Sequence, residues 1–307
     1  MKKYIKIIAF LATLLTLFSL LAGCNATLAK EEAIAIKRIG YTYQDLLADY
    51  KNPSGRPLVI AHRADLSNYP ENSLAAIRSC IDMGVDMVEL DLRKSADGVW
   101  VLSHDATLMR TTDGWGFVGR STLAELKELN LKEGRGWFAS TTEHQIATFA
   151  EALELCKGKI MINMDKLSYK DKDEIYDLLL AHDAVECAIF KFSATARQIR
   201  EWFDTLEAQG KPLPLYSPKV GRFSYESAAR ELVTFAGLAY MAEIGYRGSP
   251  KKAKQLNELC IQNGMRPMRT TLLATNDYKG AWQRGLELKF NVLMTNKPSD
   301  MLIFLSQ

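Results

Sequence analysis

The chain has 307 residues, of which 24% are charged and 48% hydrophobic, and its formal net charge is +3. Residues 1–23 hold three lysines and no acid, so the remainder carries 36 basic and 36 acidic residues. This balance excludes the polybasic surface that nucleic-acid binding requires, and no nucleic-acid partner is expected.

The first 23 residues have the pattern of a secretory signal. Lys2, Lys3 and Lys6 precede an apolar stretch that ends in small residues before Cys24. The stretch is shorter than the roughly 20 apolar residues that a transmembrane helix needs. We therefore expect residues 1–23 to be a cleaved signal peptide rather than part of the fold.

The end of this segment, Leu-Ala-Gly-Cys at residues 21–24, resembles the lipobox of bacterial lipoproteins. The resemblance implies cleavage before Cys24 and acylation of its thiol. Lipid chains on Cys24 would then anchor the exported protein to a membrane of the bacterial cell envelope. Residues 24–55 are expected to form a tether and an N-terminal segment.

The remaining four cysteines, Cys80, Cys156, Cys187 and Cys260, lie 76, 31 and 73 residues apart. These spacings match neither a small disulfide framework nor a metal-ligand motif. Each cysteine lies in an apolar context, so buried thiols are expected, although an exported protein also has the option of one disulfide.

From residue 56 to the end, apolar strand-like runs alternate with amphipathic helix-like stretches. The expected strands are residues 57–63, 86–93, 159–166, 187–192, 213–218, 238–245, 265–273 and 291–296. This order predicts an α/β fold, a TIM-type (β/α)8 barrel over residues 56–307, and the length suits such a barrel of about 250 residues. A doubly wound open sheet gives nearly the same pattern.

One stretch breaks the alternation. Residues from about 105 to 147 contain five glycines and two tryptophans, Gly114, Gly116, Gly119, Gly134, Gly136, Trp115 and Trp137, and they follow the second expected strand. This composition is typical of a loop-rich segment. We expect a small insertion after the second strand.

The second strand carries two carboxylates near its end. Glu89 and Asp91 are two residues apart and point to one face of a strand, whereas Val88, Leu90 and Leu92 point to the other. Two such carboxylates can bind a hard divalent cation through oxygen ligands. The alternative is a solvated strand face, but barrel strands are buried on both faces, which favours the metal site.

Two of the four histidines, His62 and His104, stand at the ends of apolar runs on either side of this acidic pair. Two imidazoles can supply a general base and a general acid near neutral pH. Arg63 offers a planar fork of donors to a phosphate. The combination favours phosphodiester cleavage, whereas His144 and His182 lack such neighbours and are read as structural or exposed.

Three stretches of the sequence share one resemblance: HRADLSNYPENS, VELDLRKSADGVWVLSHDATLMRTT and HQIATFAEAL. Together they resemble the glycerophosphodiester phosphodiesterase family. The resemblance implies a barrel with a small insertion after the second strand. It also implies hydrolysis of a small-molecule glycerophosphodiester to glycerol 3-phosphate and an alcohol, with Ca²⁺ or Mg²⁺ as cofactor.

The resemblance also implies residue roles. His62 and His104 would be the acid/base pair, with His104 protonating the leaving group. Arg63 would hold the phosphate, and Glu89 and Asp91 would bind the metal.

A third metal carboxylate is implied on the next strand, where the family has Asn-x-Glu-x-Lys and this chain reads INMDKL. Asp165 takes the place of the glutamate, on the same face as Asn163 but with a shorter reach. Lys166 follows the acid by only one residue, so it should point away unless the strand bulges. Lys191 is the substitute phosphate-binding cation that we expect; the alternative is a lysine that merely ends a strand.

Two further departures from the family pattern are Ala64, where the family has glycine, and Asn296, where it has aspartate. Ala64 would restrict the backbone if a positive φ were needed there. Asn296 removes a charge near the barrel mouth.

Three functions remain open from the sequence. The first is glycerophosphodiester hydrolysis. The second is a related phosphodiesterase or phospholipase that acts on an inositol phospholipid or a phosphorylated glycan, and the third is a non-catalytic envelope protein that binds phosphodiesters. Candidates for contacting the alcohol group are Glu243, Tyr240, Tyr216 and Trp137, and no protein partner is evident.

Overall fold

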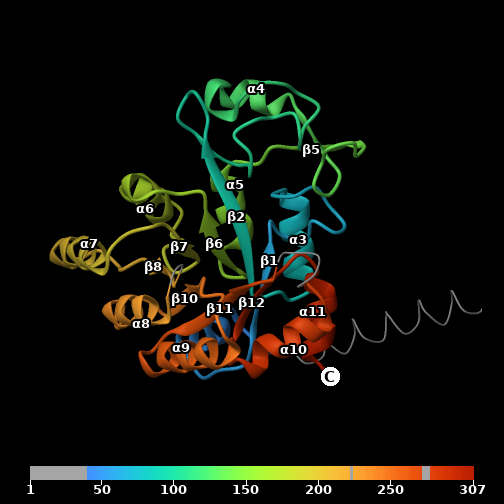
Figure 1. Ribbon diagram of the computed structural model, residues 1–307. Coiled ribbons are helices and arrows are strands. Elements are labelled where there is room, and N and C mark those ends of the chain that lie inside the picture. Colours follow the sequence, from blue (N-terminus) through green and yellow to red (C-terminus); the bar gives the residue numbers. More distant parts are fainter. Residues whose placement is uncertain (1–39, 222–223, 272–276) are drawn as a thin grey trace, which may run out of the picture.

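The computed structural model describes residues 40–221, 224–271 and 277–307. The expected signal peptide and Cys24 lie outside the described residues. Within them, strands form a curled central sheet and helices cover its outer side (Figure 1). None of the helices in these three ranges combines the length and the apolar character needed to cross a membrane.

The central sheet is built from parallel strands in the order β8-β7-β6-β2-β1-β12-β11-β10-β9. The two end strands, β8 and β9, are separated in the chain only by Ser217 and Pro218. One segment thus supplies both edges and the sheet curls back on itself, which confirms the α/β barrel. The strands are β1 (Leu58–His62), β2 (Met87–Lys94), β6 (Met161–Asp165), β7 (Ala188–Phe190), β8 (Leu215–Tyr216), β9 (Lys219–Val220), β10 (Met241–Ile244), β11 (Arg266–Thr270) and β12 (Val292–Thr295).

The fifth expected strand, residues 213–218, is found only as the short β8, and β9 begins after Pro218, beyond the predicted end. Proline has no N–H to donate to a neighbouring strand, so regular pairing stops between β8, which pairs with β7, and β9, which pairs with β10. The pairing resumes at once, because the carbonyl of Pro218 accepts the N–H of Glu243 from β10. The interruption at Pro218 therefore changes the boundaries of the strand but not the closure of the sheet.

Five of the outer helices begin at side-chain caps. Ser73, Thr148, Thr195, Ser224 and Ser249 each accept a backbone N–H from the first turn of their helix. These caps set the starts of helices whose apolar faces then pack on the sheet. The helices are α3 (Leu74–Asp82), α5 (Phe149–Cys156), α6 (Lys172–Ala181), α7 (Ala196–Ala208), α8 (Tyr225–Thr234), α9 (Pro250–Gln262), α10 (Lys279–Glu287) and α11 (Pro298–Leu305).

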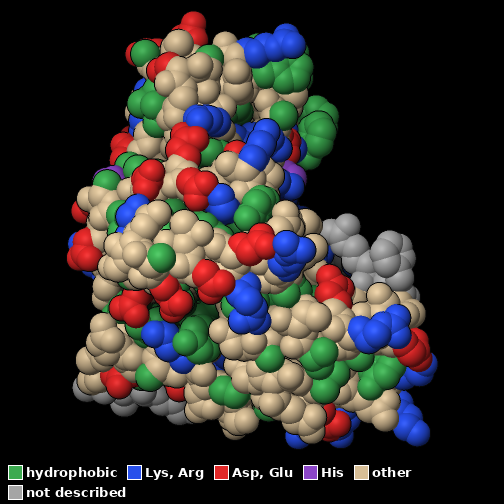
Figure 2. Space-filling model, turned by 90° about the vertical axis from the view of Figure 1, so that its left-hand side faces the viewer, with side chains coloured by type: hydrophobic (Ala, Val, Ile, Leu, Met, Phe, Trp, Pro, Cys, Tyr) green, Lys and Arg blue, Asp and Glu red, His purple; other side chains and the backbone are tan. Residues whose placement is uncertain are grey.

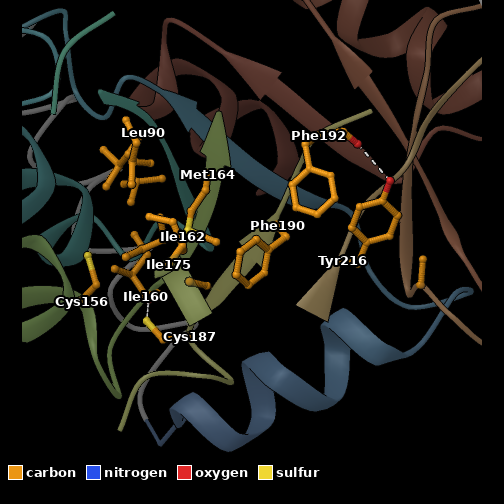
Figure 3. Packing of buried hydrophobic residues seen from close by; sticks show 14 of the residues in the cluster. Leu90, Cys156, Ile160, Ile162, Met164, Ile175, Cys187, Phe190, Phe192 and Tyr216 are labelled. Atoms are coloured by element: carbon orange, nitrogen blue, oxygen red, sulfur yellow. Dashed lines mark hydrogen bonds between the residues drawn. The ribbon is translucent and has the colours of Figure 1, made fainter. Parts of the chain in front are cut away.

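The larger hydrophobic core lies between the sheet and these helices. Leu90, Ile162 and Phe190 from successive strands pack with helical residues such as Ile175 and Cys156 (Figure 3). The four described cysteines are all buried free thiols, as predicted.

A second core fills the inside of the barrel near the N-terminal ends of its strands. It contains apolar residues from eight strands and from helix α2 (Tyr43–Lys51), which closes this end. Five of its members are methionines, whose flexible side chains fill irregular space well: Met87, Met161, Met241, Met268 and Met294. Because inward residues recur every second position, the next inward layer lies nearer the opposite end of the barrel, where His62 and Glu89 stand.

The insertion is a small lobe at the C-terminal end of the strands (Figure 1). It has its own core, which includes Val118, Leu126 and Leu131. In Figure 2 it forms the upper, narrower part of the molecule, and acidic and basic side chains are interspersed on the face shown. Its short elements were not predicted: β3 (Trp100–Leu102), which pairs with β2, then η1 (Val118–Arg120), α4 (Leu123–Lys127), β4 (Asn130–Lys132) and β5 (Thr141–Gln145).

Helix α2 is fixed to the barrel by a buried arginine. The guanidinium of Arg266 donates to the carbonyls of Asp49 and Asn52 at the end of α2, and also to those of Arg56 and Asn291. Burial lowers the pKa of Arg266 to about 10. These hydrogen bonds offset the cost of burying the charge, and they join the helix that closes the barrel to strand β11.

We predict that Arg266→Met lowers the free energy of unfolding by about 3 kcal/mol, because buried carbonyls left without a donor cost roughly 1–3 kcal/mol each. Urea unfolding measures this quantity. Arg197→Met is the matched control, because Arg197 is exposed on α7 and, among the described residues, pairs with Glu201; we expect a change below about 0.5 kcal/mol. Equal effects of the two substitutions would contradict the anchoring role.

Candidate active site

Four neighbouring strands place charged residues at the C-terminal mouth of the barrel. In the parallel ladder, Glu89 on β2 lies opposite His62 on β1 and Asn163 on β6, and Asp91 lies opposite Asp165. The strands are distant in the chain but adjacent in the sheet. Their inward side chains therefore form one site at the mouth.

Three carboxylates of this site can hold a metal ion. One oxygen each from Glu89, Asp91 and Asp165 lies within 4.8 Å of the others. Glu89 and Asp91 are only 2% and 1% exposed. Burial, and then the charge of Asp91, raise the pKa of Glu89 well above its usual value, and burial also raises the pKa of Asp91.

The raised pKa values mean that the nearby cations, Arg63 and Lys191, do not fully compensate the cost of burying this pair of carboxylates. A hard divalent cation with oxygen ligands, such as Ca²⁺ or Mg²⁺, fits such a donor set. Asn163 adds a second observation, because its fully buried amide has no hydrogen-bond partner in the described part of the chain. The residues present therefore fit the expected metal.

Lys191 supplies the nearest cation to Asp165. Its Nζ lies 2.8 Å from an oxygen of Asp165 and 3.6 Å from Glu243, which also pairs with Lys219 at 2.7 Å. Burial acts to raise the pKa of Asp165, but Lys191 holds it at about 2. The side chain of Lys166 is exposed, so the cation at this place is Lys191, the residue that follows β7.

His62 is held as a neutral imidazole. Its Nδ1 lies 2.8 Å from the amide oxygen of Asn296, which can only accept, so Nδ1 carries the proton. Burial, and then the charge of Arg63, lower the pKa of His62 to about 3. Its Nε2 is therefore unprotonated and lies 3.9 Å from Glu89.

Asn296 thus has a definite role in place of the family aspartate. Its backbone N–H donates to Asp277 at 2.8 Å, and its carbonyl accepts from Ser67 at 2.9 Å. Backbone contacts on both sides fix the position of the amide that orients His62. Asn296 was expected to remove a charge from the mouth. Its amide oxygen still provides a hydrogen-bond acceptor for Nδ1 of His62.

Arg63 lies between the acidic triad and a fourth carboxylate. Its backbone N–H donates to Glu89 at 3.0 Å, its Nη1 lies 3.0 Å from both oxygens of Glu71, and its Nε lies 3.4 Å from Asp91. Arg63 and Ala64 have φ values of 56° and 63°. Ala64 thus adopts the positive φ that glycine would favour, at a cost of roughly 1–2 kcal/mol.

Asn72 fixes the orientation of Asp91. Its side-chain amide donates to Asp91 at 3.0 Å, and its oxygen accepts the backbone N–H of Asp91 at 3.1 Å. The next residue, Ser73, caps the start of α3. The turn that precedes α3 is therefore attached to β2 at Asp91, close to the start of the helix.

His104 reaches the site through a chain of charged hydrogen bonds. Its Nδ1 lies 2.6 Å from Asp105, Asp105 is 2.6 Å from Nε of Arg110, and Arg110 is 2.7 Å from Glu71. Partial burial acts against ionisation of Asp105, but hydrogen bonds from Arg110 and His104 lower its pKa to about 2. Glu71 therefore joins both arginines.

Glu71, Asp105 and Arg110 were not assigned by the sequence analysis. Their signal was present, since Glu71 belongs to the PENS string and Arg110 to the RTT string. Nothing in the spacing indicates that these residues pair with each other.

Of the four candidates for contacting the alcohol group, two are misplaced. The ring of Tyr240 lies 6.1 Å from that of Tyr50 on α2, at the closed end of the barrel. Tyr216 points outside the barrel, where it is buried and its hydroxyl donates to a backbone carbonyl. Only Glu243 at the mouth and Trp137 on the insertion remain.

The acidic triad makes a prediction about metal binding. Ca²⁺ or Mg²⁺ at one hundred times its dissociation constant should raise the free energy of unfolding by about 2.7 kcal/mol, and EDTA should reverse the gain. Glu89→Gln should abolish the gain without destabilising the metal-free protein, because it removes a repelling charge. Urea unfolding with and without metal tests this, with exposed Glu186→Gln as control. A full metal response in Glu89→Gln would contradict this site.

The comparisons with known proteins agree with this geometry. Residues 62–205 match the model of the Glycerophosphoryl diester phosphodiesterase family. This range begins at His62 and includes the acidic triad, His104 and Lys191. The resemblance inferred from the motifs is thus confirmed over this range.

Two relatives of known name match part of the chain. A glycerophosphodiester phosphodiesterase from Caldanaerobacter subterraneus is 40% identical over 111 residues, which are 36% of this chain and 45% of that protein. Glycerophosphodiester phosphodiesterase 1 from Bos taurus is 31% identical over 179 residues, which are 52% of this chain and 54% of that protein. The chain thus spans about half the length of the curated relatives it matches.

Solved structures share the fold over most of the chain. A glycerophosphoryl diester phosphodiesterase from Parabacteroides distasonis superposes with a TM-score of 0.69 and 22% identity, over 86% of this chain and 91% of that one. A phosphodiesterase from Oleispira antarctica, solved with the product sn-glycerol-3-phosphate, gives a TM-score of 0.59 and 20% identity, over 82% and 98%. At these identities the likeness establishes the fold alone.

Proposed function

We propose that this chain belongs to the glycerophosphodiester phosphodiesterase family and is a metal-dependent phosphoric diester hydrolase. It releases glycerol 3-phosphate and an alcohol from glycerophosphodiesters. The observation that carries this proposal is the acidic triad beside a neutral His62 and Arg63 at the barrel mouth, within the segment that the family model matches. The names of the relatives support the substrate class.

His62 suits the role of general base. Hydrolysis requires a base to take the proton of the attacking oxygen, and an imidazole whose Nε2 is unprotonated can do so. Asn296 holds Nδ1–H and thereby fixes this tautomer. The pKa of about 3 keeps His62 neutral across the physiological range.

His104 suits the role of general acid. Asp105 binds Nδ1, so the imidazolium form donates its other proton, from Nε2, to the leaving oxygen and returns to a neutral ring still bound to Asp105. Arg63 holds the phosphate, with Lys191 as a further cation near Asp165. A divalent cation held by the acidic triad would neutralise charge on the phosphate.

The departures from the family pattern do not favour a non-catalytic role. Asp165 keeps a carboxylate oxygen in the triad, Asn296 orients His62, and Ala64 takes the positive φ. These contacts support a catalytic role rather than binding alone. Product identity separates the proposed activity from cleavage of an inositol phospholipid or a phosphorylated glycan.

We predict that the purified chain releases glycerol 3-phosphate from glycerophosphocholine or glycerophosphoethanolamine with Ca²⁺ or Mg²⁺, and that EDTA stops the reaction. His62→Ala and His104→Ala should each lower kcat by about 10²- to 10⁴-fold, the usual contribution of a general acid or base. An enzyme-coupled assay for glycerol 3-phosphate measures this.

His182→Ala is the matched control, because His182 pairs with Glu154 on the surface. Its kcat should stay within about twofold of the original, as for substitutions outside an active site. No turnover by the folded protein with either metal would refute the activity. A cyclic or sugar phosphate as product would instead support another phosphodiester substrate.

The cellular location is a second proposal, carried by residues outside the described ranges. The signal-like residues 1–23 and the lipobox-like end at Cys24 support export, lipidation of Cys24 and anchoring to the bacterial envelope.

We predict that the full chain, expressed in a bacterium with radiolabelled palmitate, incorporates the label and sediments with membranes. Cys24→Ser should lose the label, because no thiol remains at the lipidation position, whereas Cys80→Ser should keep it, because Cys80 is a buried thiol. Labelling that persists in Cys24→Ser would rule out this anchor.

A further inference from the structure

A loop of the insertion, residues 133–140, is attached to the charged network of the site. This loop joins β4 to β5. The carbonyl of Gly134 accepts the N–H of Glu71 at 2.9 Å, the guanidinium of Arg110 donates to the carbonyl of Arg135, and the N–H of Trp137 donates to the carbonyl of Arg110 at 2.8 Å. The loop is therefore held at Gly134 and Arg135 by Glu71 and Arg110, the two residues that also bind Arg63 and Asp105.

Gly136 shows how closely the loop approaches Arg110. Its φ is +73°, and a Cβ at this position would lie 1.9 Å from the carbonyl oxygen of Arg110. No other residue fits there without a shift of the backbone. The place of Arg135 beside the site is thus set by contacts along the loop, although its side chain is exposed.

Arg135 stands beside the arginine pair of the site. Its carbonyl accepts from Arg110, which binds Glu71, and Glu71 in turn binds Arg63. Arg63 is paired with Glu71, and Lys191 with Asp165. In the part of the chain that the structure describes, no carboxylate pairs with Arg135.

We infer that Arg135 is a second phosphate-binding arginine, which contacts the phosphate of the substrate from the side of the insertion. The inference rests on the proposed function and names a residue for it that the motifs do not contain. A guanidinium presents a planar fork of N–H donors, which suits two phosphate oxygens. Because Arg135 has no competing carboxylate, an incoming phosphodiester or phosphate monoester meets an available fork.

The first test is kinetic, on the full chain. Arg135→Ala should raise KM for the glycerophosphodiester about 10-fold and leave kcat within about twofold, because the contact exists both before and during the reaction. Arg135→Lys should recover part of the affinity, since it keeps the charge but loses the fork. The control is Arg120→Ala, whose guanidinium stacks on Phe117 in the same insertion.

The second test does not depend on turnover. Inorganic phosphate is titrated into the full chain in the presence of Mg²⁺, and binding is followed by calorimetry. Arg135→Ala should weaken phosphate binding about 10-fold, which is about 1.4 kcal/mol, and Arg120→Ala should leave it unchanged. If the chain hydrolyses no glycerophosphodiester, the proposed function fails, while this titration still decides the role of Arg135.

Two results would overturn the inference. One is a wild-type KM and phosphate affinity in Arg135→Ala, and the other is an equal loss in Arg120→Ala. A circular dichroism melt of each variant separates loss of binding from loss of fold. Because the Arg135 side chain is exposed, both of its variants are expected to melt as the original does.

Discussion

The site depends on one buried carboxylate that binds two arginines. Glu71 is 3% exposed, and its two oxygens accept from both Arg63 and Arg110. Through Arg63 it is joined to the acidic triad, and through Arg110 to Asp105 and His104. Its own N–H holds the insertion loop at Gly134. Removal of this one negative charge would leave two guanidinium groups facing each other in a partly buried place, which is strongly unfavourable.

The interior of the barrel changes from apolar to charged along the strands. The methionine-rich core lies at the end closed by α2, and His62, Glu89 and Lys191 belong to inward layers nearer the mouth. An apolar floor excludes water from one side of the charged layer, which explains why burial is the first cause of the shifted pKa of His62 and of Glu89. The alternation of inward and outward residues along each strand therefore places apolar residues in the core near α2 and charged residues in the site at the mouth.

The sequence allowed the barrel to be predicted because strand and helix periods differ and alternate clearly. It also predicted that Glu89 and Asp91 share a face, since that follows from a spacing of two. The pairing of Lys191 with Asp165 could not be predicted from the sequence, because it depends on which strands are neighbours and in which register they pair. The Glu71–Arg110 pair spans 39 residues and depends on the path of an irregular insertion. The end of β8 before Pro218 could not be predicted from the apolar pattern, because it depends on the missing N–H of one residue.

The position of α2 has a consequence for the direction from which substrate arrives. The helix closes the N-terminal end of the barrel, and the charged mouth lies at the opposite end. A chain anchored through Cys24, as proposed, would join the described fold at Gly40, next to the helix that closes the barrel. Substrate would then reach the mouth at the end of the barrel opposite the one where the N-terminal segment joins it.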